Sequence, residues 1–388
     1  MIHARHLLLP LLGVMLLGGP ANAFQPADYK TEKWTPLQLS LLWPDYQLFH
    51  DTYNVCGLRL GLLTTENRNL YGLDIGLINE CETFAGVQLC GYSAKTQDAR
   101  GLQLALGFIR VDDYDAWGVQ LAGLGGCVRD FHGIQITGVQ NYNRTVSGLT
   151  FALWETEVDA VSGFQIGGVF ATADGVDGFQ FAVGHAQLRQ HPLHGLQLAG
   201  LWADAPQLRG VQFALFCGRV RSETFRGLQI AGLAAFDVPA HPVPEGPNPA
   251  DEKVVPETDG RGLQMAAVVC ENFTLNGLML TLGWNDARNS INGMQFALAL
   301  NHTREMNGVQ LALFNLADTL AGCQAGAVNL GGTESGCQLG LVNVADHHDG
   351  VQAGLVNYSR ELTGVQLGLV NIGRNCRFPC LPLLNARF

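Results

Sequence analysis

One short motif recurs along most of this chain and constrains its fold more than any other feature. A glycine is followed by an apolar residue, usually glutamine, a second apolar residue and a small residue, as in residues 364–368, GVQLG. The motif occurs twenty times from residue 57 onward, at intervals of 14 to 17 residues with one gap of 35. A repeat of this length predicts an architecture in which each copy packs mainly against its neighbours.

Each copy begins at an anchor glycine, counted here as position zero. The anchors are Gly57, Gly72, Gly86, Gly101, Gly118, Gly133, Gly148, Gly163, Gly178, Gly195, Gly210, Gly227, Gly262, Gly277, Gly293, Gly308, Gly322, Gly336, Gly350 and Gly364. In the last five copies, position two holds Gln310, Gln324, Gln338, Gln352 and Gln366, and position seven holds Asn315, Asn329, Asn343, Asn357 and Asn371. These copies follow one another every 14 residues.

The period of apolar residues within each copy is two, which is typical of a strand, and glycine within the repeat disfavours a helix. The chain is therefore predicted to be all-β. We expect the apolar side chains at positions one and three to form the core and the small residue at position four to face a close neighbour. Glycine at zero and asparagine at seven are expected at corners, since both tolerate positive φ.

Two architectures can use such strands. A β-solenoid of about twenty coils stacks the copies in parallel and in register, so that the Gln and Asn side chains form ladders. An up-and-down outer-membrane β-barrel reverses every second copy and turns the apolar residues toward lipid. Polar residues flank a stripe of only three apolar positions, which favours the solenoid, whereas the irregular residues at positions eight to thirteen argue against it.

The N-terminal residues are typical of a cleavable secretory signal peptide. Basic residues precede an apolar run over residues 7–17, and residues 21–23, ANA, end it, so we expect residues 1–23 to be removed. Residues 24–56 are expected to hold an N-terminal cap with a degenerate first copy over residues 36–41. The repeat array then covers 57–236 and 262–375, and a cap strand covers 376–388.

The gap in the array is a proline-rich segment. Residues 237–261 contain Pro239, Pro242, Pro244, Pro247 and Pro249, and a sixth proline lies farther along, so they predict an exposed insertion loop. Such an insertion costs little closure entropy. We interpret it as a tolerated insertion, with a displayed binding loop as the alternative.

The composition indicates few partners directly. The formal net charge is −11 and no run of Lys or Arg occurs, so nucleic acid is an unexpected partner. Residues 346–349, DHHD, are interpreted as a solvated turn rather than a transition-metal site. Asp112, Asp113 and Asp115 could bind Ca²⁺ weakly through oxygen ligands, but the sequence there has no loop of the kind that supplies six or more oxygens, so a calcium site is not expected. His185, His191 and His194 fall between copies. We therefore expect no catalytic site and no cofactor.

Two cysteine pairs could form disulfides if the chain is exported. Cys323 and Cys337 both occupy position one in consecutive copies, which would place them side by side in a parallel stack. Cys376 and Cys380 flank Pro379 and could staple the C-terminal cap, although free thiols are the alternative.

The clearest copies, residues 350–357 (GVQAGLVN) and 364–371 (GVQLGLVN), resemble exported bacterial proteins built on GLQIGLIN-like units, such as the surface-repeat family of spirochaetes. Residues 381–385, LPLLN, are similar to the final strand of that group. The resemblance fades toward the N-terminus, where position two holds Arg59, Asp74, Thr150 or Met279. It implies a location at the cell surface or envelope and supplies no catalytic residue.

Taken together, these observations predict an exported, non-catalytic repeat scaffold of the cell surface, periplasm or outer membrane. Its expected partner is a protein, a glycan or another envelope component. The alternative is an outer-membrane barrel that forms a pore or a membrane anchor. We also expect self-association, because exposed strand edges at the ends of a repeat array are adhesive.

Overall fold

The computed structural model describes residues 33–42, 47–221, 225–237 and 260–388. The expected signal peptide and nearly all of the proline-rich insertion lie outside these described residues. Strand accounts for 83% of the structure, in a β-solenoid of about 19 turns. The chain forms two compact units, divided after Arg189, and each is described by itself.

The first unit contains nine strands. They are β1 (Trp34–Ser40), β2 (Asn54–Gly61), β3 (Thr64–Ala105), β4 (Phe108–Ala122), β5 (Gly125–Thr137), β6 (Gln140–Ala152), β7 (Glu155–Gly167), β8 (Phe170–Ala182) and β9 (His185–Leu188). The pairings are parallel, from β1 with β2 to β8 with β9. Anchors pair with anchors, for example Gly118 with Gly133. Consecutive copies therefore stack directly in register.

The second unit contains thirteen strands. They are β10 (Leu193–Ala199), β11 (Trp202–Ala205), β12 (Leu208–Ala214), β13 (Cys217–Val220), β14 (Phe225–Ala231), β15 (Ala234–Asp237), β16 (Gly260–Ala266), β17 (Val269–Thr281), β18 (Trp284–Phe296), β19 (Leu300–Leu311), β20 (Phe314–Ala353), β21 (Val356–Gly373) and β22 (Cys380–Arg387). Strand β10 pairs with β12 and β11 with β13, because one coil contributes a seven-residue segment, a bend and a four-residue segment.

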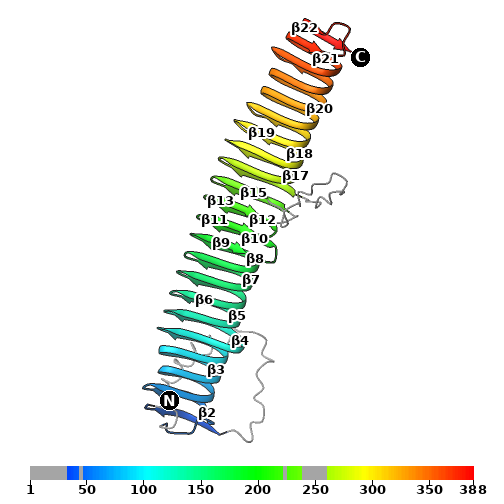
Figure 1. Ribbon diagram of the computed structural model, residues 1–388. Helices are drawn as coiled ribbons and strands as arrows, with labels where there is room; N and C mark the ends of the chain where they lie inside the picture. Colours follow the sequence, from blue (N-terminus) through cyan, green and yellow to red (C-terminus); the bar gives the residue numbers. More distant parts are fainter. Residues whose placement is uncertain (1–32, 43–46, 222–224, 238–259) are drawn as a thin grey trace, which may run out of the picture. The chain divides into compact units, whose positions relative to one another are not determined.

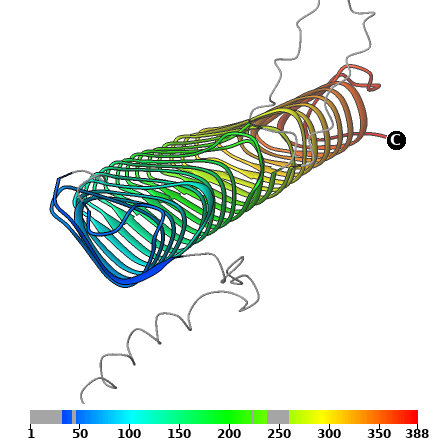
Figure 2. The ribbon, with the colours of Figure 1, turned by 90° about the horizontal axis from the view of Figure 1, so that it is seen from below.

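The parallel register decides between the two predicted architectures. Parallel stacking identifies the solenoid, as expected, and excludes the alternating strand directions of the up-and-down barrel. Figure 1 shows the successive coils of each unit, and Figure 2 shows coils of the first unit closing around a common interior. The insertion leaves this register intact, since Gly227 of β14 pairs with Gly262 of β16.

The anchor glycines make the first corner of each coil. Nineteen of them have φ between 126° and 151°, a region that residues with a side chain rarely adopt. A Cβ on Gly350 would also overlap the carbonyl oxygen of Gly336 in the preceding coil. The expected corner at asparagine seven is wrong, because the bend lies at Gly354 and Leu355 and Asn357 already lies within β21.

The two faces of the repeat are reversed relative to the prediction that positions one and three form the core. Gln103 is buried, whereas Leu102 and Leu104 on either side of it are partly exposed. The small residue at position four points inward, as Ala105 does. Glutamine can point inward because its amide bonds to the coils above and below, which removes the cost of burying a polar group. The apolar side chains at positions one and three therefore lie on the outer surface.

Each unit carries a cap at its end of the array. At the N-terminal end, β1 is the first copy, and its buried Gln38 bonds to Gln47 and to the backbone of Phe49. At the C-terminal end, β22 pairs antiparallel with β21, and Asn385 donates to Gln366. Both terminal glutamines are therefore covered by the chain itself, and self-association through the terminal strands stays a prediction.

Candidate interaction surface

The glutamines of position two form a hydrogen-bonded column inside each unit. In the second unit, Gln310 donates to Gln295 over 2.7 Å and Gln324 donates to Gln310 over 2.8 Å. The same bond joins the remaining copies, with Gln338, Gln352 and Gln366 each donating to the glutamine before it. All are fully buried. The column is thus a part of the core and is inaccessible to a partner.

The asparagines of position seven form a second buried column beside it. Asn315 donates to Asn329, and the chain of bonds continues through Asn343, Asn357 and Asn371 at 2.7 to 2.9 Å. Most of these asparagines also donate to a backbone carbonyl of the following coil, as Asn329 does to Leu339. The asparagines hold consecutive coils together from inside and do not form a surface.

In the first unit an ion pair begins the glutamine column. Arg59 donates two hydrogen bonds to the Asp74 carboxylate, at 2.8 and 2.7 Å, and a third to the carbonyl of Glu80. Asp74 also accepts from Gln88, where the glutamines start. Both charged side chains are fully buried. Burial alone would lower the pKa of Arg59, but the Asp74 carboxylate outweighs it, so the pKa lies above its ordinary value.

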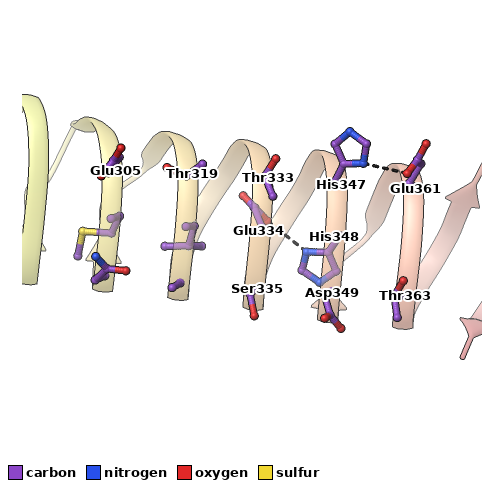
Figure 3. Close-up of a pocket in the computed structure, with 14 residues that line it drawn as sticks. Glu305, Thr319, Thr333, Glu334, Ser335, His347, His348, Asp349, Glu361 and Thr363 are labelled. Atoms are coloured by element: carbon purple, nitrogen blue, oxygen red, sulfur yellow. Dashed lines mark hydrogen bonds and ion pairs between the residues drawn. The ribbon is translucent and has the colours of Figure 1, made fainter. Parts of the chain in front are cut away.

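A third inward column lies two residues before each anchor and is apolar in seventeen of the twenty copies. Glu334 and His348 interrupt it in consecutive coils. Their side chains are fully buried, with Nδ1 of His348 3.2 Å from Oε2 of Glu334 (Figure 3). Gln338 donates to the other oxygen over 2.7 Å. Burial raises the pKa of Glu334, while His348 and Gln338 oppose that shift. The solvated-turn interpretation is therefore wrong for His348.

The neighbouring residues of that segment do lie on the surface. His347 is exposed and contacts Glu361 of the next coil at 3.0 Å, and Asp349 is exposed as well (Figure 3). A hollow of about 400 Å³ on this side is lined mostly by polar residues, including Thr319 and Ser335. Among the described residues, no three His, Cys, Asp or Glu side chains are placed to hold a metal ion.

The other titratable residues singled out from the sequence are not brought together. Asp113 and Asp115 are exposed and Asp112 pairs with Arg110 on the outer surface. His191 is exposed, and His185 and His194 belong to different units, β9 and β10. This part of the chain offers no site of convergent side chains.

The ten cysteines are free thiols in the structure. Cys323 and Cys337 contact each other in consecutive coils without a disulfide. Parallel in-register side chains keep their Cβ atoms near the strand spacing of ~4.8 Å, beyond the ~3.5–4.5 Å that a disulfide prefers. Cys376 and Cys380 are also unpaired, with the Cys376 thiol directed at Asn375. Neither cysteine pair staples the fold in this structure.

The most extensive surface feature is an outer apolar face. It consists of positions one and three and of the residues at the bend, at positions five and six, together with position seven in the coils where that residue is exposed, as Trp202 and Trp284 are; in the last five copies position seven is the buried asparagine. In the second unit none of these positions, all of which are described, carries Asp, Glu, Lys or Arg. Large side chains exposed on it include Phe213, Phe216, Trp202, Trp284, Met294, Phe296, Leu339, Val351 and Leu367. The exposed charged residues of these coils lie on the remaining outer positions, whereas Asp204, Asp237 and Glu334 are buried.

The bend is the most exposed part of this face and forms a leucine ridge. In the second unit the ridge consists of Leu201, Leu215, Leu233, Val268, Leu282, Leu298, Leu313, Leu341, Leu355 and Leu369, which are 40% to 62% exposed. Backbone bonds join the bends, as from Leu355 to Leu341 over 3.0 Å and from Leu313 to Leu298 over 3.2 Å. The coil between Leu313 and Leu341 has the smaller Ala327 at this position, so the ridge is a convex line of aliphatic side chains that is lower at one coil, on hydrogen-bonded backbone.

Comparisons with known proteins add no family to this description. The chain matches no protein-family model, no curated protein and no solved structure. Within the described residues, no helix is long and apolar enough to cross a membrane.

Proposed function

We propose that this chain is an exported, non-catalytic scaffold of the cell envelope or surface that attaches to its target through the outer apolar face. The observation that carries the proposal is the size of this face. In the second unit, eleven coils stacked ~4.8 Å apart and about 20 Å of apolar width per coil give on the order of 1,000 Å². The largest apolar patch of an ordinary soluble monomer is about 300–600 Å².

The interior of the coils supports a structural role. Buried Gln and Asn columns tie each coil to the next, and these bonds are made whatever lies outside. The glutamine ladder is internal, so it is not a binding surface. The outer side chains can therefore vary without disturbing the stack of coils. We assign binding of the target to these outer side chains.

The location in the envelope rests on the sequence. Residues 1–23 are typical of a signal peptide, and the copies at Gly350 and Gly364 resemble exported surface repeat proteins. An extended apolar face is costly in water and favours attachment to another surface. Export and attachment together define an envelope scaffold.

The test is to follow the exported chain in a bacterial host that secretes it. Fractionation should recover it outside the cytoplasm without residues 1–23, and with the envelope rather than in the medium. A ridge variant, with Leu313, Leu341 and Leu355 each changed to Glu, should still be exported but should be released.

The matched control changes the exposed Thr319, Thr333 and Thr363 of the polar side to Glu. It adds the same charge to neighbouring coils and should stay with the envelope. Retention of the ridge variant to the same extent as the control would contradict attachment through the apolar face. A chain that stays in the cytoplasm would contradict the envelope location.

A further inference from the structure

We propose that the occupant of the outer apolar face is a lipid surface, on which the solenoid lies with its leucine ridge inserted among the acyl chains. This inference rests on the proposed function and names the partner of the same surface. Ten of the eleven coils of the second unit would contribute a ridge residue to the membrane, so the axis of this unit would lie in the plane of the membrane.

The shape of the face supports lipid over a second copy of the chain. The apolar residues lie on both sides of a bend, so the face is convex along the ridge that includes Leu298 and Leu313. A second copy could cover this face only with an apolar groove. The hollows described on the coils, about 400 and 360 Å³, are instead lined mainly by polar residues such as Thr333 and Glu66. Acyl chains conform to a convex surface without any groove.

The backbone of the face meets the requirement of a lipid environment. Polar backbone groups in lipid must be bonded within the protein, because no water is present to satisfy them. In the coils that carry the ridge, backbone bonds run from coil to coil even through the bends, as between Val268 and Leu233 and between Val370 and Leu355. The ridge can therefore enter the apolar layer without exposing the bend amides that make these bonds.

The charge pattern indicates which lipid property is recognised. The outer apolar face of the second unit has no charged residue among its described positions, and the whole chain has a net charge of −11. Attraction to anionic headgroups is therefore no source of affinity, and the binding energy comes from apolar area. Binding to phosphatidylcholine, whose zwitterionic headgroup has no net charge, should persist at high salt, since salt screens only charge interactions.

Two tryptophans report on insertion. Trp202 and Trp284 follow the bends next to Leu201 and Gly283 and are exposed on the apolar face. If the ridge enters the acyl layer, their fluorescence should shift to shorter wavelength and be quenched by brominated phosphatidylcholine. Adsorption through the polar side would leave both indoles in water.

The experiment is flotation of the purified exported chain with protein-free phosphatidylcholine vesicles in 0.1 and 0.5 M NaCl, with tryptophan quenching on the same samples. The wild-type chain should float at both salt concentrations. The variant with Glu at positions 313, 341 and 355 should bind at least about tenfold more weakly, since each charge opposes burial of its ridge position. The control with Glu at positions 319, 333 and 363 should bind like the wild type.

Several results would overturn the inference. These are no flotation, equal loss in the two variants, flotation only with anionic lipid at low salt, or ridge-dependent dimers in sedimentation without vesicle binding. A variant with Ser at the three ridge positions, compared by urea unfolding, separates lost binding from lost folding. If the envelope retains the chain through its ridge but the chain does not bind vesicles, the partner is not lipid. The proposed function as an envelope scaffold is then unaffected. If export or ridge-dependent retention fails, the proposed function itself fails.

Discussion

Gly331 leaves open the space that Glu334 occupies inside the second unit. A Cβ on Gly331 would overlap the Glu334 carboxylate, whose two oxygens bond to Gln338 and face His348. Neighbouring coils have Ala317 and Ala345 at the position of Gly331. The absence of a side chain at Gly331 thus makes room for the Glu334 carboxylate. The buried pair of Glu334 and His348 therefore fits inside the coils.

This relationship predicts the effect of removing one member or both. Glu334→Leu should lower the free energy of unfolding by about 3–5 kcal/mol, because His348 and Gln338 lose their buried acceptor. The double change of Glu334 and His348 to Leu continues the apolar column of Leu320 and Leu362 and should recover most of the loss. Urea unfolding of the wild type and of the two variants measures the loss and its recovery. If the double variant is no more stable than Glu334→Leu, the interpretation of an apolar column with one polar interruption is wrong.

The buried ion pair of the first unit predicts a similar contrast. Asp74→Ala leaves Arg59 buried with the carbonyl of Glu80 as its remaining acceptor of those described, so the loss should be about 3–5 kcal/mol. Changing Arg59 and Asp74 together to Gln extends the column that starts at Gln88 and should cost far less. Thermal or urea unfolding compares the variants. Equal losses would show that the ion pair has a role that amides cannot replace.

The strand class follows from the sequence because a period of two is a property of the extended backbone. The same strands fit a solenoid or a barrel, and only the polar residues that flank the apolar stripe favoured the solenoid, which the parallel register confirms. Which face points inward does not follow from that period, since positions one and three alternate symmetrically with two and four. The general preference for buried apolar residues favoured the wrong face. Glutamine could be the buried residue only because identical amides stack one coil apart, a contact between distant residues.

One signal in the sequence does identify the inward face. Position minus two has the same parity as Gln at position two, and it holds large apolar residues such as Leu70, Phe84 and Phe131, all fully buried. In this column Glu334 and His348 are the two titratable residues, so the sequence alone identifies them as exceptions.

The leucine ridge is harder to recognise in the sequence, because the position of the bend within the repeat differs by one residue between copies of 14 and 15 residues.

The break in the glutamine column at Met279 predicts a stabilising substitution. Gln264 has a buried Oε1 atom without a partner among the described residues. On the other side, the Gln295 amide donates to the Met279 sulfur at 3.8 Å and to the carbonyl of His302 at 3.4 Å, and it has no amide acceptor in the coil of Met279. Met279→Gln should join the two halves and raise the free energy of unfolding by about 1–2 kcal/mol, from two added hydrogen bonds.

The control for this substitution is Met265→Gln, which makes the same change at position three on the outer face of the preceding coil. It should leave the urea midpoint nearly unchanged. A lower midpoint for Met279→Gln than for wild type would mean that the two amides cannot align across this coil, contrary to the register of Gln264 and Gln295 with Met279.

Asp237 predicts a pH dependence of stability. This carboxyl group lies inside the coil that precedes the insertion, and burial raises its pKa from 3.8 to about 8, while a hydrogen bond with Asn272 opposes the shift. The folded chain therefore binds this proton more tightly than the unfolded chain. The stabilising contribution is complete below the unfolded pKa of 3.8 and is lost as the pH rises through about 8.

Asp237→Asn keeps the shape and removes the charge, so it should stabilise the chain at pH 8 and have little effect at pH 4. Urea midpoints across this range test the claim, with the exposed Asp318→Asn as the matched control. A pH profile that is the same for wild type and Asp237→Asn would show that Asp237 is not the group that titrates.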